Sequence, residues 1–298
     1  MNRPESTIDH LPSAKLVVVT GPTASGKSSL AMSLAKRFNG EIVAADSMTI
    51  YKGMDIGTDK PTKADQKAVK HWTLDIAGPG QRFTAADFKE YAEQAIADIQ
   101  SRGKLPVVVG GTGLYIDALI YDFSFGQPVN LKQRQGLQKL SIEELQVMIK
   151  QKGYSMPENS KNRRHLVRTI ERQGQSGQRA QDLPKGFIVV GMLPADEELK
   201  TKIGRRVEAM FDEGLVDETK KMAAIYKPEG LLTKAKVCYG PVWEYLNGLL
   251  SLEEAKERLK IVHWQFARRQ KTWFRRNPHI NWFSDQAKAE DFVSSQLG

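Results

Sequence analysis

The feature that most constrains this chain is a phosphate-binding loop near its start. Residues 21–28 read Gly-Pro-Thr-Ala-Ser-Gly-Lys-Ser and fill every fixed position of the pattern G-x-x-x-x-G-K-[ST]. The loop follows an apolar run, Leu16–Val19, and precedes a stretch with helical apolar spacing at Leu30, Leu34 and Phe38. A strand, a loop and a helix in this order surround phosphate oxygens with backbone N–H groups and the positive end of the helix. The chain is therefore expected to bind a diphosphate or a triphosphate.

Each residue type in the loop suggests a role. Gly21 and Gly26 allow the backbone to approach a ligand closely. Lys27 supplies a positive charge to the phosphates, and Ser28 offers a hydroxyl to Mg²⁺, a hard cation that prefers oxygen ligands and keeps several waters. We therefore predict Mg²⁺ as the cofactor, with Ser28 as its protein ligand. The predicted diphosphate-binding residues are Gly21, Pro22, Thr23, Ala24, Ser25, Gly26, Lys27 and Ser28.

Two further predicted strands end in polar or glycine-rich segments. The run Glu41–Ala45 is followed by Asp46-Ser47, and the run Leu105–Val109 is followed by Gly110-Gly111-Thr112-Gly113. Ligands of open α/β sheets bind outside the carboxyl ends of the strands, so Asp46 is expected near the phosphate loop. There it would accept a proton or hold Mg²⁺ through water, although an Asp after a strand is equally often a helix N-cap. No acidic residue ends the later strand, which disfavours a motor or an ATPase.

The order of the predicted elements indicates an α/β fold. Strands are predicted at Leu16–Thr20, Glu41–Asp46, Leu105–Val109 and Phe187–Met192, with helices between them. This alternation predicts a P-loop NTPase-like parallel sheet flanked by helices. Residues 125–185 are polar and helical in pattern, and Ser141-x-x-Glu144 forms a capping box. We therefore assign residues 1–124 and 186–298 to the catalytic core and residues 125–185 to a helical insertion domain.

A long helix is predicted to begin at Ser251, where Glu254 completes a second capping box. Its predicted apolar face comprises Leu252, Ala255, Leu259, Val262, Phe266 and Trp273. A neighbouring stripe that is expected to face a phosphate backbone comprises Trp264, Arg268, Lys271 and Arg275.

Charge and composition narrow the class of partner. The 298 residues carry a formal net charge of +9, and basic residues are concentrated at 161–172 and 268–276. Clustered Arg and Lys beside an aromatic residue favour nucleic acid, although a solvated basic helix face is the common alternative. A single cysteine, Cys238, excludes a disulfide framework. Met1–Leu11 lacks the apolar core of a signal peptide and no run is long enough to span a membrane, so we expect a cytoplasmic protein without membrane contact.

These motifs resemble the bacterial tRNA dimethylallyltransferases, the tRNA isopentenyltransferase family. The resemblance rests on the phosphate loop and on residues 46–58, which read Asp-Ser-Met-Thr-Ile-Tyr-Lys-Gly-Met-Asp-Ile-Gly-Thr. It extends over residues 109–115 and 266–274. It implies transfer of a dimethylallyl group from dimethylallyl diphosphate to N6 of the adenosine 3′ of the anticodon in tRNA, with release of diphosphate. The loop would then hold the diphosphate of the donor, which accounts for the missing acidic residue.

The resemblance also implies roles for single residues. Asp46 would be the general base, and Thr23 and Arg206 would stabilise the leaving diphosphate; without the resemblance, Arg206 would be interpreted as a surface ion pair. The helical insertion would hold the anticodon stem-loop of tRNA. The implied tRNA contacts are Asp46, Ser47, Met48, Thr49, Thr112, Arg134, Arg164, His165, Leu166, Val167 and Arg168, with Lys236 as a further candidate. The chain departs from the usual family pattern at Thr49, Ser160, Lys161, Cys238 and Gly240.

Three other functions are compatible with the motifs. A small-molecule or nucleoside kinase would use the phosphate loop and a nearby Asp for phosphoryl transfer. An RNA-binding protein would use the loop as a nucleotide switch without catalysis, and a prenyltransferase acting on free AMP or ATP would share the chemistry. The basic runs and the insertion disfavour a kinase and a mononucleotide substrate, since neither needs them. We expect a monomer.

Overall fold

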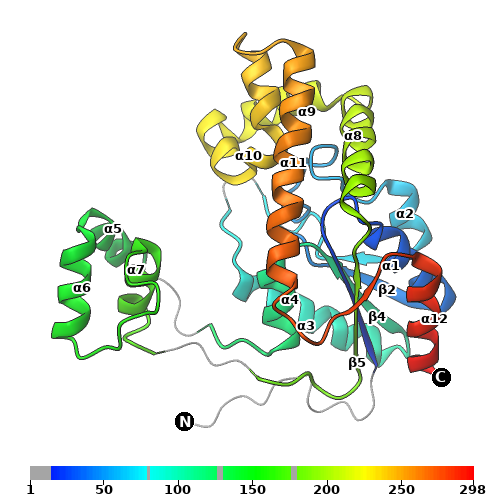
Figure 1. Ribbon diagram of the computed structural model, residues 1–298, viewed down its shortest axis with the longest axis horizontal. Coiled ribbons are helices and arrows are strands. Elements are labelled where there is room, and N and C mark those ends of the chain that lie inside the picture. Colours follow the sequence, from blue (N-terminus) through cyan, green and yellow to red (C-terminus); the bar gives the residue numbers. More distant parts are fainter. Residues whose placement is uncertain (1–14, 79–80, 126–129, 176–179) are drawn as a thin grey trace. The chain divides into compact units, whose positions relative to one another are not determined.

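The computed structural model describes residues 15–78, 81–125, 130–175 and 180–298, and Met1–Leu11 lies outside them. The chain divides into two compact units, drawn in Figure 1: a core unit, Met1–Ile120 with Asp182–Gly298, and an inserted unit, Tyr121–Gln181. The boundaries expected from the sequence lie a few residues further along the chain at both ends of the insertion. Within the described ranges, no helix combines the length and the apolar character that a membrane span requires.

A six-stranded parallel sheet forms the centre of the core unit, in the order β3-β2-β4-β1-β5-β6. The strands are β1 (Leu16–Thr20), β2 (Gly40–Ala44), β3 (His71–Trp72), β4 (Leu105–Gly110), β5 (Phe187–Met192) and β6 (Asn281–Phe283). All five residues of β1 are buried, because β4 and β5 flank it and helices cover both faces of the sheet. The predicted P-loop NTPase-like α/β sheet is confirmed. The edge strands β3 and β6 were not predicted, since two and three residues are too short for a periodic signal.

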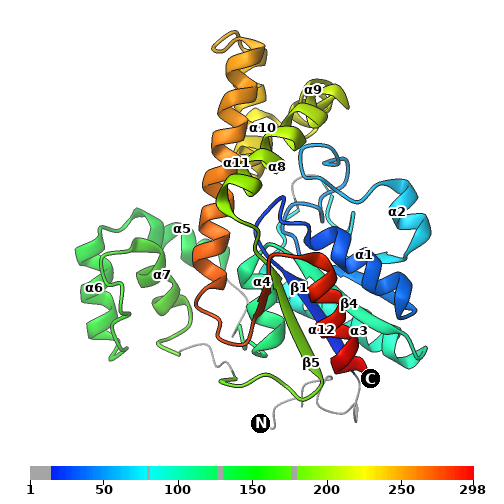
Figure 2. The same ribbon diagram turned by 45° about the vertical axis from the view of Figure 1, so that its right-hand side comes forward.

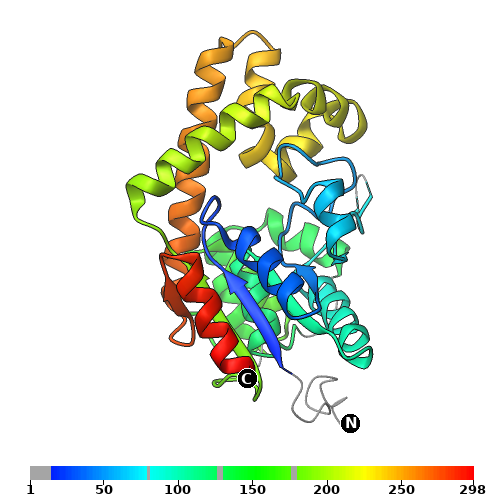
Figure 3. The same cartoon turned by 90° about the vertical axis from the view of Figure 1, so that its right-hand side faces the viewer.

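Helices cover both faces of the sheet. α1 (Lys27–Arg37) and α12 (Gln286–Leu297) pack together on one face, visible in front of the sheet in Figure 3. α3 (Ala85–Ser101) and α4 (Gly113–Ile120) pack on each other and on the other side of the strands. A short helix, α2 (Lys63–Ala68), precedes β3. The carboxyl ends of the central strands remain uncovered by these helices, so loops gather there.

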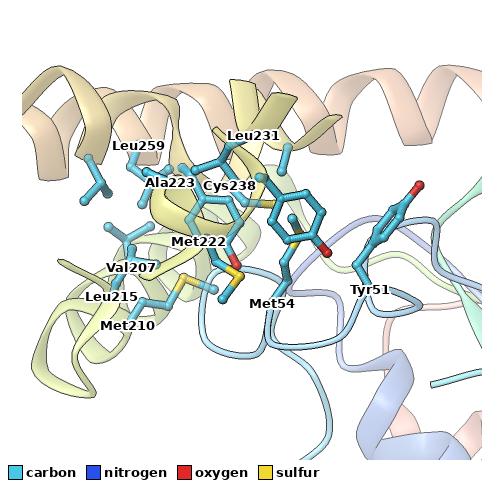
Figure 4. Close-up of a cluster of buried hydrophobic side chains, with 14 of the residues drawn as sticks. Tyr51, Met54, Val207, Met210, Leu215, Met222, Ala223, Leu231, Cys238 and Leu259 are labelled. Carbon is cyan, nitrogen blue, oxygen red and sulfur yellow. The ribbon is translucent and has the colours of Figure 1, made fainter. Parts of the chain in front are cut away.

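Four helices gather beyond the carboxyl ends of the strands (Figure 2): α8 (Asp196–Asp212), α9 (Leu215–Tyr226), α10 (Pro228–Leu246) and α11 (Leu252–Phe274). They share a hydrophobic core with the loop that follows β2. Figure 4 shows Met54 of that loop beside Met222 of α9 and Cys238 of α10, and Tyr51 of the same loop belongs to this core at its edge in the view. The loop that carries Asp46 is thereby held between the sheet and the helices.

The predicted capping box at the start of α11 is confirmed, because Ser251 and Glu254 exchange the expected hydrogen bonds. The predicted apolar face of α11 is wrong at both ends, since Leu252 and Trp273 are 37% and 40% exposed. The face that the structure buries consists of Ala255, Leu259, His263, Ala267, Gln270 and Phe274. His263 and Gln270 on this face are polar. A prediction from apolar residues alone therefore assigned the wrong face of α11 to the core.

The described residues of the inserted unit form the helices α5 (Leu131–Lys139), α6 (Ile142–Gln151) and α7 (Arg163–Glu171). Their small core comprises Leu137, Leu145, Ile149, Leu166, Val167 and Ile170. The predicted capping box Ser141–Glu144 begins α6. The insertion is therefore helical, as the sequence predicts, and it has a hydrophobic core of its own.

Candidate active site

The phosphate loop joins β1 to α1 at the carboxyl edge of the sheet. The N-cap residue of α1 is Gly26, which has no side chain to cap the first turn, so the N–H groups of that turn suit a ligand. Gly21 has φ +144°, and a Cβ atom there would lie 2.4 Å from the carbonyl oxygen of Met192, so only glycine fits. The buried Ser25 Oγ has no hydrogen-bond partner among the described residues. A buried polar atom of this kind in an N–H-rich loop suits an anionic ligand.

The loop forms one wall of a cavity of about 880 Å³ within the core unit. Side chains from the loop, from the segment after β2 and from α8, α10 and α11 surround it. They include Thr23, Lys27, Ser28, Asp46, Ser47, Met48, Thr49, Arg206, Cys238, His263, Phe266 and Gln270. A cavity of this size holds a small-molecule ligand. Three of the predicted phosphate-binding residues, Thr23, Lys27 and Ser28, thus line one cavity with Asp46, the predicted general base.

Asp46 faces the same cavity as Lys27 although their strands are not neighbours. β4 lies between β1 and β2, yet the charge of Asp46 acts on the ammonium of Lys27. Asp46 Oδ1 accepts a hydrogen bond of 2.8 Å from the N–H of Met48. The hydroxyl of Thr112 accepts a bond of 3.0 Å from the N–H of Ser47. These bonds fix the turn after β2, and the other oxygen of Asp46, Oδ2, makes no hydrogen bond within the described part of the chain.

Lys27 is half-buried in the cavity wall and forms no ion pair with a carboxylate among the described residues. Burial, followed by repulsion from Arg206, lowers the pKa of Lys27 to about 8, while Asp46 and Asp59 act in the opposite direction. Its Nζ donates a hydrogen bond of 3.2 Å to the carbonyl of Pro22. A bound diphosphate would favour the charged form of Lys27, so this electrostatic arrangement is typical of an anion-binding site.

Arg206 connects α8 to the phosphate loop. Its Nη1 donates a hydrogen bond of 2.6 Å to the Thr23 hydroxyl, and its Nη2 lies 3.1 Å from a carboxylate oxygen of Asp59. Its Nε is buried and has no hydrogen-bond partner within the described ranges. The alternative interpretation of Arg206 as a surface ion pair is therefore incomplete, because the same guanidinium reaches into the cavity.

The residues that were predicted to contact tRNA differ in their surroundings. In the core unit, Thr112 lies at the turn after β4, Lys236 is exposed, and Thr49 is buried in the cavity wall with an unpartnered hydroxyl among the described residues. In the inserted unit, Arg164 and His165 are exposed and Arg168 is half-buried. Asp46, Ser47 and Met48 line the cavity described above. The remaining three predicted contacts are Arg134, Leu166 and Val167.

Two of these three cannot contact a ligand through their side chains. Leu166 and Val167 are buried in the hydrophobic core of the inserted unit, because they occupy the inner face of α7. Arg134 makes two hydrogen bonds of 2.6 Å to the carboxylate of Glu171. It lies on a helix rather than on a loop, and its guanidinium is largely engaged within the unit.

The second basic run forms a shallow hollow on α11. Arg268, Arg269, Arg276 and Trp273 line this hollow of about 370 Å³ together with Gln265 and Thr272. The predicted stripe is wrong at Lys271, which forms an ion pair with Asp196. The indole N–H of Trp273 donates a hydrogen bond to Asp117. Arg268 and Arg275 of the predicted stripe are exposed, and the hollow adds the exposed Arg269 and Arg276 to the basic surface.

Sequence patterns gave no sign of Glu218, which organises the segment after Asp46. Its carboxylate accepts hydrogen bonds from the backbone N–H groups of Asp55, Ile56 and Gly57 at 3.0, 2.8 and 2.8 Å. It also accepts one of 2.8 Å from the hydroxyl of Tyr239. All these partners are distant from residue 218 in the sequence, so no local spacing could reveal the contacts.

The oxygen atoms of the cavity side chains could hold Mg²⁺ only together with oxygen atoms from a bound ligand. Within the described ranges, no three His, Cys, Asp or Glu side chains are grouped to hold a metal. Ser28 and Asp46 both line the cavity and offer hard oxygen atoms. Mg²⁺ commonly takes one or two protein oxygens and completes its shell with phosphate oxygens and water. Ser28 therefore fits the predicted role of a single protein ligand beside a bound diphosphate.

Comparisons with known proteins agree with the geometry. A model of the family described as IPP transferase matches residues 49–277. The tRNA dimethylallyltransferase of Anoxybacillus flavithermus is 38% identical over 280 residues, covering 90% of each chain. That of Acetivibrio thermocellus is 37% identical over 299 residues, covering 95% of this chain and 96% of the relative.

Solved structures show the same fold. The tRNA isopentenylpyrophosphate transferase of Bacillus halodurans is 33% identical with a TM-score of 0.71, covering 95% of this chain and 96% of the other. A eukaryotic dimethylallyltransferase acting on tRNA has a TM-score of 0.78 at 23% identity, covering 95% of this chain and 80% of the other, and this match bears on the fold alone. The family model and the near-full-length relatives together establish that the chain belongs to the IPP transferase family.

Proposed function

We propose that this chain transfers a dimethylallyl group from dimethylallyl diphosphate to N6 of the adenosine 3′ of the anticodon in tRNA. One observation carries the proposal: Asp46 and the cationic pair Lys27 and Arg206 line a single cavity. A carboxylate beside an anion-binding loop suits a reaction in which an amine loses a proton while a diphosphate departs. Membership in the IPP transferase family supports the same reaction class.

The residues supply the two functions that this substitution needs. The N6 lone pair forms a bond to C1 of the allyl group as the C1–O bond breaks, and that bond's electrons leave with the diphosphate. Asp46 accepts the N6 proton through Oδ2, while the Met48 N–H holds Oδ1. Lys27, Thr23 and Arg206 stabilise the charge that develops on the leaving oxygen. Mg²⁺ held at Ser28 would neutralise part of the charge of the diphosphate.

The adenosine must leave its stack to reach an enclosed donor, at a cost of a few kcal/mol. We propose that Thr112 contacts the extruded nucleotide; its hydroxyl accepts a hydrogen bond from the Ser47 N–H in the turn that carries Asp46, which supports this role. The exposed Arg164 and His165 of the inserted unit and the basic hollow on α11 are proposed contacts to the phosphate backbone. We propose that the protein acts as a cytoplasmic monomer.

Mass spectrometry of nucleosides from treated tRNA tests the proposal. The full chain is incubated with Mg²⁺, unmodified tRNA and dimethylallyl diphosphate, and we expect a gain of one C5 unit on a single adenosine. Labelled ATP replaces the donor in a second arm, and AMP replaces tRNA in a third. Label transfer from ATP would indicate a kinase, prenylation of AMP would indicate a mononucleotide enzyme, and tRNA binding without product in any arm would indicate a non-catalytic RNA-binding protein. Each of these outcomes would contradict the proposal.

A further inference from the structure

Gln270 is a buried amide at the junction of three segments of the core unit. It lies on the inner face of α11 and is only 6% exposed. Its Oε1 accepts a hydrogen bond of 2.8 Å from the backbone N–H of Thr23 in the phosphate loop. Its Nε2 donates one of 2.9 Å to the backbone carbonyl of Gly111, directly after β4. One side chain therefore connects α11 to the loops that follow two neighbouring strands.

We infer that Gln270 is a positioning residue that sets the distance between the diphosphate-binding loop and the turn that carries Thr112. This inference rests on the proposed function, because it assigns a catalytic consequence to that distance. A neutral primary amide presents an acceptor and a donor at one side-chain end, and both are needed here. A carboxylate would keep the bond from the Thr23 N–H but would face the Gly111 carbonyl with a second acceptor.

The backbone of the turn is matched to this amide. A Cβ atom on residue 111 would lie 2.3 Å from Nε2 of Gln270, so the close approach requires glycine. The amide and Gly111 therefore form a unit, because a side chain at position 111 would require the amide of Gln270 to move.

Both partners of Gln270 lead to residues that are proposed to act in the reaction. Thr23 accepts the hydrogen bond from Arg206 at 2.6 Å, on the side of the leaving group. Gly111 precedes Thr112, whose hydroxyl accepts from the Ser47 N–H beside Asp46. A shift at Gln270 would therefore move the base and the leaving-group residues relative to each other. Misplacement of reacting groups by about 1 Å can cost on the order of 10²-fold in rate.

The test compares Gln270→Glu with the wild-type chain, using Gln296→Glu as a control at an exposed position of α12. We expect Gln270→Glu to lower kcat by about 10- to 100-fold, with the Kd for dimethylallyl diphosphate and the KM for tRNA changed less than threefold. Rates are expressed per folded protein. Gln270→Asn keeps the amide on a shorter side chain. We expect its kcat to lie between that of the wild type and that of Gln270→Glu.

A second measurement does not depend on catalysis. Hydrogen exchange of the peptide that contains Thr23 is followed in the wild type and in Gln270→Met, and we expect exchange at least tenfold faster in the variant. Unchanged exchange would overturn the inference, as would an unchanged kcat in Gln270→Glu, or a loss confined to donor affinity. A wild-type chain that does not prenylate tRNA would instead contradict the proposed function, so the two failures are distinguishable.

Discussion

The guanidinium of Arg206 donates a hydrogen bond of 2.6 Å to the hydroxyl of Thr23 across 183 residues of sequence. This contact joins α8, which belongs to the helices beyond the sheet, to the loop after β1. The same Arg206 is paired with Asp59, so its position is fixed from two sides. The anion-binding end of the cavity is therefore assembled from three separate segments of the chain.

Removal of the proposed base is expected to affect catalysis far more than folding. Asp46→Asn keeps the acceptor for the Met48 N–H but cannot take the N6 proton. We expect kcat to fall by about 10²- to 10⁴-fold. The midpoint of thermal unfolding should change little, and the exposed Asp217→Asn serves as a control. A loss below tenfold would exclude Asp46 as the general base.

Arg206 and Thr23 are expected to act as one group. Arg206→Gln and Thr23→Val should each lower kcat by about 10²- to 10³-fold, as loss of one preorganised donor does. The double variant should lose much less than the product of the two effects, because either change already breaks the contact. Arg205→Gln, at the neighbouring exposed position, controls for loss of positive charge. Independent, multiplicative losses in the double variant would contradict the coupling.

Glu218 is expected to be important for stability. Glu218→Gln would replace a carboxylate that accepts three backbone bonds and one tyrosine bond by an amide whose NH₂ group faces donors. We expect the free energy of unfolding to fall by about 1–3 kcal/mol. Denaturant titration measures this change, and Glu213→Gln, which alters an exposed residue, should leave the midpoint nearly unchanged. A stability equal to that of the wild type would show that the loop does not depend on this carboxylate.

His263 is expected to make the protein less stable as the pH falls. Burial, followed by repulsion from Arg206, lowers the pKa of His263 from 6.5 to about 3, while the backbone of Val237 acts in the opposite direction. Between these values the unfolded chain binds a proton that the folded chain does not, so stability is full above about pH 6.5 and declines below it. The contribution is at most about 1.4 kcal/mol per pH unit.

Denaturant unfolding of the wild type and of His263→Asn between pH 7 and 5 checks this expectation. The difference in free energy of unfolding between the two proteins should shrink as the pH falls. His165→Asn, at an exposed position of α7, should follow the wild-type profile. Parallel profiles for the wild type and His263→Asn would contradict the assignment.

The central sheet and the phosphate loop could be predicted because their signals are local. The apolar run of β1, the glycine positions of the loop and Lys27 specify a strand, a loop and a helix within a short stretch. Apolar runs also identify β4 and β5 as strands. Asp46 could be predicted as well, since the carboxyl ends of parallel strands meet at one edge.

The remaining parts of the site depend on contacts that no local pattern encodes. Gln270 is 247 residues from Thr23 and lies in a helix whose periodicity is dominated by apolar residues. Counting apolar positions therefore left it out of the buried face. Leu166 and Val167, which the family resemblance implied as tRNA contacts, lie on the side of α7 that packs into the hydrophobic core, and the resemblance does not show which residues of a helix face inward.

The contact between Gln270 and Thr23 can form only after both segments have been synthesised. A ribosome translating this chain produces the phosphate loop long before α11. A further 247 residues follow Thr23 before the amide of Gln270 is made. A truncated translation product that ends before α11 would thus carry an intact loop motif without the side chain that secures it.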